Sequence, residues 1–90
     1  MADDRPIAEL RNIGPVSGRR LQVVGISTAG DLEAYGAAAA FVRIKDAGFR
    51  PSLNLLWALQ GALLDLDWSA LPKELKAKLR RQVEVLSQED

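Results

Sequence analysis

The residues whose types and spacing could do chemistry lie in one turn-forming segment near the N-terminus, Leu10-Arg11-Asn12-Ile13-Gly14-Pro15-Val16-Ser17-Gly18-Arg19-Arg20-Leu21. A glycine turn that leads into a helix presents backbone N–H groups and the positive end of the helix dipole, and both attract a phosphate. Arg19 and Arg20 follow in the first turns of that helix, where a cation can reach the next phosphate. The chemistry this predicts is contact with a nucleic-acid backbone that does not read bases.

The segment resembles a helix-hairpin-helix motif, in which a Gly-x-Gly turn faces the phosphates. Gly14 takes the position of the second glycine and Asn12 that of the first. Asparagine tolerates a left-handed backbone better than most residues, but we expect its side chain to add bulk towards the phosphate. The predicted nucleic-acid-binding residues are Arg11, Asn12, Gly14, Val16, Ser17, Gly18, Arg19 and Arg20.

Composition argues against catalysis. The 90 residues contain no cysteine and no histidine, which excludes thiol nucleophiles, histidine-dependent triads and the commonest metal ligands. The nearest carboxylate pair, Asp65 and Asp67, is spaced so that the two side chains would point apart in a helix. We therefore expect no enzyme activity, no cofactor and no metal site.

Charge is balanced overall but unevenly distributed. Twelve Lys and Arg residues match twelve Asp and Glu residues, so the chain as a whole is not a polybasic nucleic-acid binder. Residues 5–20 hold four arginines and one glutamate, a net charge of +3, and residues 73–81 hold five cations and one glutamate, a net charge of +4. Either run also fits a solvated helix face.

Glycine and proline predict two helix–turn–helix units that would position these residues. In the first unit, a short helix opens at Pro6 and stops at Gly14-Pro15, and a second helix is capped by Ser17. Gly25 sits where a left-handed residue would end this helix in a Schellman motif. The predicted inward side chains of this unit are Ile7, Leu10, Ile13, Leu21, Val24 and Ile26.

The second unit repeats this pattern. A third helix is capped by Thr28 and ends at Gly36, and a fourth runs over residues 37–47 and ends at Gly48. The turn at Gly36 has no nearby cations, so we expect it to be architectural. The predicted inward side chains are Leu32, Tyr35, Ala40, Phe41, Ile44 and Phe49.

Two further helices complete the prediction. Ser52 is placed to cap a fifth helix around Trp57, which is apolar on nearly every side and is expected to be buried as the central helix. Pro72 opens the last helix, which is amphipathic. Its apolar stripe is Leu75, Leu79, Val83 and Leu86.

The sequence therefore predicts an all-α fold of five to six short helices: tandem helix-hairpin-helix-like units, a buried fifth helix and an amphipathic C-terminal helix. Residues 1–90 are expected to form one domain, with frayed tails over residues 1–5 and 87–90. The N-terminus has no apolar signal core, and no apolar stretch has the length of a membrane span, so we expect a cytoplasmic protein without a membrane partner.

A family resemblance covers roughly residues 7 to 80. The matching positions are Leu10-x-Asn12-Ile13-Gly14-Pro15, Leu21, Gly25-Ile26-x-Thr28, Asp31-Leu32, Gly36-Ala37, Leu55-Leu56-Trp57-Ala58-Leu59-x-Gly61-Ala62, Trp68 and Leu71-Pro72. They resemble the C-terminal domain of the bacterial TfoX/Sxy competence regulators. The resemblance implies an all-helical domain with a helix-hairpin-helix-like core, in a family connected with regulation of DNA uptake. Full-length members carry a separate N-terminal domain. The motif here begins almost at Met1, so we expect a stand-alone domain.

Two functions remain open on the sequence. The first is a non-catalytic DNA-binding or DNA-linked regulatory module that contacts phosphate through the first hairpin. The second is a protein–protein interaction module, including a homodimer, that does not bind nucleic acid directly. Balanced charge and the missing first glycine of the turn favour the second function, and the arginines beside Gly14 favour the first.

Overall fold

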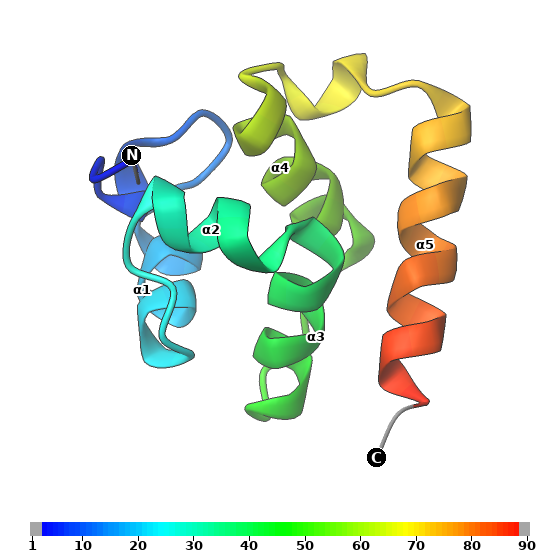
Figure 1. The fold of residues 1–90 in the computed structure, drawn as a ribbon, viewed down its shortest axis with the longest axis horizontal. Coiled ribbons are helices and arrows are strands. Elements are labelled where there is room, and N and C mark those ends of the chain that lie inside the picture. The colour runs from blue at the N-terminus through cyan, green and yellow to red at the C-terminus, as the bar shows by residue number, and fades with distance from the viewer. Residues whose placement is uncertain (1–2, 89–90) are drawn as a thin grey trace.

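Five α-helices and two short 3-10 helices fold around one another in the computed structural model, which describes residues 3–88 (Figure 1). In chain order they are η1 (Ile7–Glu9), α1 (Pro15–Val23), α2 (Ala29–Tyr35), α3 (Ala37–Asp46), α4 (Leu53–Leu64), η2 (Trp68–Ala70) and α5 (Lys73–Ser87). No β-strand occurs within residues 3–88, and the all-α prediction with five helices is confirmed.

The central helix is α3, not the leucine-rich helix that the sequence predicted. α3 contacts α1, α2, α4 and α5, and it lies between α2 and α5 in Figure 1. Its alanines at 37, 38 and 40 are buried, and their small side chains let neighbouring helices approach closely. α4 does bury Trp57, but it exposes Leu53 and Leu64 at its two ends. The fully buried large side chains are Ile7, Leu21, Ile26, Leu32, Ile44, Leu56 and Leu59.

The first unit differs from its prediction at both ends of the turn. The segment before the turn forms only the 3-10 helix η1, because Leu10 is already extended and Asn12 has a left-handed φ of 72°. α1 begins at Pro15 with Gly14 as its N-cap, so the prediction that Ser17 caps this helix is wrong. Proline suits the first helical position because its φ is preset and its missing N–H needs no partner.

The repeat holds at the left-handed glycines that end α1 and α3 but not at the turns. Gly25 has a φ of 89°, and the N–H groups of Gly25 and Ile26 donate to the carbonyls of Gln22 and Leu21 at 3.0 and 2.8 Å, which completes the predicted Schellman motif. Gly48 is also left-handed, at 99°. The turns differ, since Gly14 is extended at −93° whereas Gly36 is left-handed at 82°.

α2 begins as predicted. The N–H of Asp31 donates to Thr28 Oγ1, and the N–H groups of Ser27 and Thr28 donate back to Asp31 Oδ2. These backbone hydrogen bonds lower the pKa of Asp31. The last residue of α2 departs from the prediction: Tyr35 is 41% exposed, and the Arg43 guanidinium lies over its ring at 4.9 Å.

The described chain ends make regular backbone contacts. Residues 3–5 run beside the start of α2, where Ala29 and Gly30 donate N–H bonds to the carbonyls of Arg5 and Asp3 at 2.9 and 2.7 Å. At the other end, α5 continues to Ser87. The frayed tails over residues 1–5 and 87–90 stay a prediction, and residues 1–2 and 89–90 lie outside the described range.

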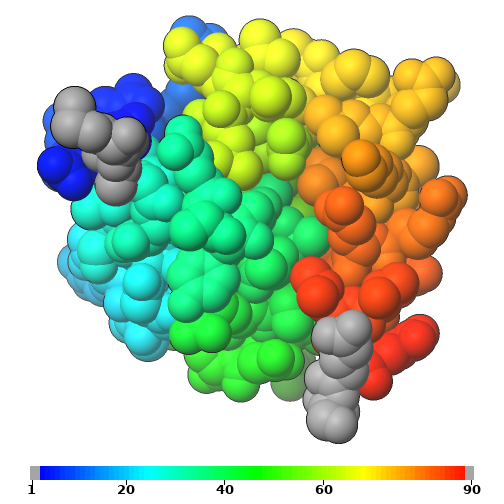
Figure 2. Space-filling view, in the orientation of Figure 1, coloured from blue at the N-terminus to red at the C-terminus, as the bar shows by residue number. Residues whose placement is uncertain are grey.

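α5 covers one side of the bundle, next to α3. Leu79 on its apolar stripe is buried, and Leu75 and Val83 pack against the core. Figure 2 shows the orange to red surface of α5 along the green surface of α3. Within residues 3–88, no helix combines the length and the apolar character that a membrane span requires.

Trp57 tests the packing of α4. We expect Trp57→Ala to lower the free energy of unfolding by about 3–5 kcal/mol, because it leaves a cavity in the core. Leu64→Ala on the same helix removes a side chain that is 47% exposed, and should change stability by no more than about 0.5 kcal/mol. Urea denaturation measures both. Equal effects of the two substitutions would contradict the burial of Trp57.

Gly25 tests the helix-ending motif. Gly25→Ala places a Cβ at a φ of 89° and should destabilise by about 1 kcal/mol. Gly25→Asn should cost less, since asparagine adopts the left-handed conformation more readily. Thermal unfolding followed by circular dichroism compares the two variants with the parent. A Gly25→Ala protein as stable as the parent would show that the Schellman motif does not contribute to stability.

Candidate nucleic-acid interface

The turn before α1 is fixed by the side chain of Asn12. Its Nδ2 donates to the Leu66 carbonyl at 2.8 Å, and its Oδ1 accepts from the Trp68 N–H at 3.3 Å. The carboxamide therefore points towards the link between α4 and η2. This corrects the expectation that Asn12 adds bulk on the side that a phosphate would approach.

Gly61 on α4 makes room for this contact. A Cβ at Gly61 would lie 2.5 Å from Asn12 Nδ2 and 2.6 Å from the Leu66 carbonyl oxygen. The sequence did not predict this requirement, because nothing local to Gly61 indicates that a residue near the other end of the chain approaches it.

The N-terminus of α1 is open to solvent. Gly14 caps it without a side chain, Pro15 has no N–H, and the first helical hydrogen bond runs from Gly18 to the Gly14 carbonyl at 2.8 Å. The N–H groups of Val16 and Ser17 have no hydrogen-bond acceptor among residues 3–88. Space in front of Gly14 is free, since an added Cβ would meet no atom within 4 Å.

One predicted site residue faces inward. Gly18 is buried, and a Cβ there would come within 2.9 Å of the Ala8 side chain. Its lack of a side chain lets η1 lie against α1, so Gly18 belongs to the packing of the hairpin and is removed from the candidate surface.

The three predicted arginines are placed differently. Arg11 is exposed and its Nε lies 3.4 Å from Asp65 Oδ1, an ion pair that partly neutralises it. Arg19 is exposed on α1. Arg20 is half-buried, with its guanidinium 5.1 Å from the centre of the Phe49 ring. Within the described part of the chain, neither Arg19 nor Arg20 forms an ion pair.

A polar pocket of about 420 Å³ lies beside this turn, between α1 and the start of α4. Asn12, Ser17 and Arg20 line it from the first hairpin, and they are joined by Arg50, which the sequence predicted only as part of a helix-breaking link. Among the described residues, the two arginines are the only charged ones that line it, and none of the lining residues is acidic. The pocket therefore favours an anion.

Nearby carboxylates are already engaged by other groups. Asp65 pairs with Arg11, and Asp67 caps η2 by accepting hydrogen bonds from the hydroxyl and the N–H of Ser69. The bond from the Ser69 hydroxyl is the main reason that the pKa of Asp67 is lowered, so it stays ionised. Among residues 3–88, no acidic cluster could hold a metal ion.

These features define a small all-helical domain with an open helix start and an arginine-lined pocket next to it. The chain belongs to the TfoX C-terminal domain family, whose family model matches residues 3–83. No curated protein sequence matches the chain.

Two solved structures share the fold. An uncharacterized protein from Listeria monocytogenes, in a triclinic crystal form, is 31% identical with a TM-score of 0.82, over 92% of this chain and 94% of that one. A protein of unknown function from Listeria monocytogenes, in a tetragonal form, is 32% identical with a TM-score of 0.80, over 89% of this chain and 99% of that one. These similarities support the fold and the family without adding an activity.

Asn12 tests the link between the turn and η2. Asn12→Gly keeps a residue that tolerates positive φ but removes both hydrogen bonds, so it should lower the free energy of unfolding by about 1–2 kcal/mol. Asn12→Ala should cost more, because it adds backbone strain. Asn54→Ala, at an exposed position on α4, serves as the control. Chemical denaturation measures all three, and an Asn12→Gly protein as stable as the parent would contradict the bridging role.

Proposed function

We propose that this domain binds the phosphate backbone of nucleic acid through the turn at residues 12–20, as a non-catalytic DNA-binding or DNA-linked regulatory module. One observation carries the proposal: two kinds of phosphate donor lie on the same hairpin. The N–H groups of Val16 and Ser17 are unpaired, and Arg19 and Arg20 have no carboxylate partner, within the described range. Backbone N–H groups and guanidinium groups are the donors that proteins use for phosphate.

Binding of this kind does not depend on base sequence and is sensitive to salt. Cations that neutralise phosphates release condensed counterions, so affinity falls as salt rises, with a slope set by the number of phosphates neutralised. The chain has a net charge of zero, which limits long-range attraction. We therefore expect modest affinity that depends on the local cluster.

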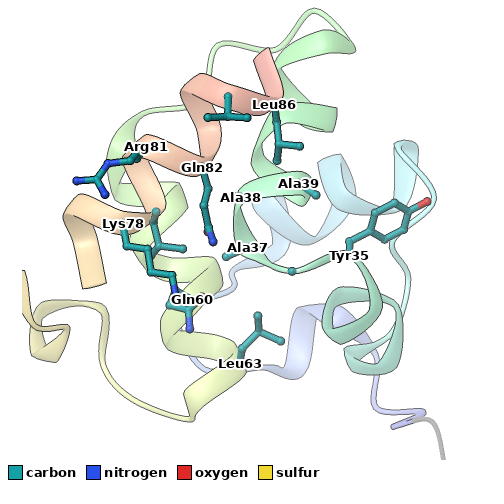
Figure 3. Close-up of a pocket in the computed structure, with 13 residues that line it drawn as sticks. Tyr35, Ala37, Ala38, Ala39, Gln60, Leu63, Lys78, Arg81, Gln82 and Leu86 are labelled. Atoms are coloured by element: carbon teal, nitrogen blue, oxygen red, sulfur yellow. The ribbon is translucent and has the colours of Figure 1, made fainter. Parts of the chain in front are cut away.

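A second candidate is a protein-interaction module, favoured by a cavity of about 700 Å³ between α3, α4 and α5. Figure 3 shows Gln60 and Leu63 from α4 and Lys78, Gln82 and Leu86 from α5 around it. Its floor includes the alanines at the start of α3. A mostly apolar cavity with cations at its edge also suits a protein partner.

The experiment is a titration of labelled duplex and single-stranded DNA at low and moderate salt. Arg19→Ala should weaken binding to all sequences alike, and the salt slope should fall by about one unit for each phosphate that the variant no longer neutralises. Arg20→Ala should act in the same way, although it also removes packing on Phe49. Arg80→Ala removes an exposed cation on α5 and is the control, with no expected effect.

Gly14→Val tests the contribution of the backbone N–H groups to binding separately from that of the cations. Gly14 is extended and has open space before it, so valine fits without backbone strain but blocks approach to α1. Binding at low salt should weaken while the salt slope stays the same, and Gly14→Ala, which adds only a Cβ in open space and occupies neither N–H group, should bind more like the parent. The protein-interaction module would be favoured if the parent binds DNA with a Kd weaker than about 100 μM at low salt. It would also be favoured if substitutions of Lys76 and Arg80 weaken DNA binding while those of Arg19 and Arg20 do not.

A further inference from the structure

The polar pocket beside the turn brings together the groups that recognise a nucleotide. Arg20 and Arg50 supply guanidinium groups, Ser52 and Asn54 supply hydrogen-bonding side chains, and Trp68 supplies an aromatic ring. Its volume of about 420 Å³ is at the small end of the range for organic ligands.

The two kinds of group select different parts of a ligand. Guanidinium groups favour a phosphate, and the Ser52 hydroxyl can join them because it makes no capping hydrogen bond to α4. Trp68 is 41% exposed, so its ring is accessible for stacking on a nucleobase. A ligand that uses both kinds of group carries a phosphate and a flat aromatic base.

Trp68 is held in register with the phosphate-binding turn. The backbone N–H of Trp68 donates to Asn12 Oδ1. Asn12 precedes the open N–H groups of Val16 and Ser17 by only a few residues. Ser17 and Arg20 line the pocket from α1 itself. A strand whose backbone crosses the start of α1 would therefore pass the mouth of the pocket.

We propose that this pocket takes one unpaired nucleotide of a single strand, so that the domain prefers single-stranded nucleic acid to duplex. The inference rests on the proposed backbone binding. In a duplex each base is stacked and paired and must be extruded before it can enter a pocket. A duplex can thus contact the turn but leaves the pocket empty, whereas a single strand uses both.

Fluorescence anisotropy with three labelled probes tests this preference. The probes are an oligothymidylate of about 12 nucleotides, an abasic strand of the same length and phosphate number, and a blunt-ended duplex without unpaired nucleotides. The parent should bind oligothymidylate about five- to tenfold more tightly than the abasic strand or the duplex. Trp68→Ala should abolish that difference, and Arg50→Gln should weaken oligothymidylate binding most. Arg80→Ala, the matched charge control, should leave the difference intact.

The two indole N–H signals in NMR spectra give a readout that a purely structural role would not move. Oligothymidylate should shift the Trp68 signal, assigned with a Trp68→Phe variant, while the buried Trp57 serves as the internal reference. Equal binding of all three probes, with no effect of Trp68→Ala and no shift at Trp68, would overturn the pocket while leaving backbone binding in place. Absence of binding to any probe would overturn both proposals.

Discussion

The carboxamide of Asn12 is the contact on which the candidate site depends. It joins the turn before α1 to the link after α4, across 54 residues of chain, and it does so from a left-handed backbone that turns its side chain towards Leu66. The same contact holds Trp68 beside the pocket. Without it, the open start of α1 and the aromatic side of the pocket would be joined by one exposed ion pair, between Arg11 and Asp65.

Local rules predicted most helix ends because their chemistry is contained in a few consecutive residues. The Schellman motif at Gly25 and the capping box of Thr28 and Asp31 need no information from the rest of the fold. The error at Ser17 came from competition between two local patterns: Gly14 followed by Pro15 begins a helix at least as well as a serine does, and the serine became an ordinary residue of the first turn.

Long-range features could not be read in this way. Apolar residues on nearly every side indicated that α4 would be the central helix, but α3 occupies the centre because its alanines allow close packing on several sides. Arg50 entered the candidate site only when folding placed it opposite α1. Gly18 left that site because η1 covers it. In each case the role of the residue depends on which element packs next to it in the fold. The spacing of residues along the chain does not predict that neighbour.

The close approach at Gly61 has a consequence for how such domains diverge. A side chain at this position would occupy the space of the Asn12 amide and the Leu66 carbonyl. We therefore expect the two positions to be coupled in evolution: a larger residue at 61 needs both the loss of the amide at 12 and a shift of the Leu66 carbonyl. An alignment of relatives should show these two sites changing together, although they stand far apart in the sequence, and lineages without either residue should carry a differently placed η2.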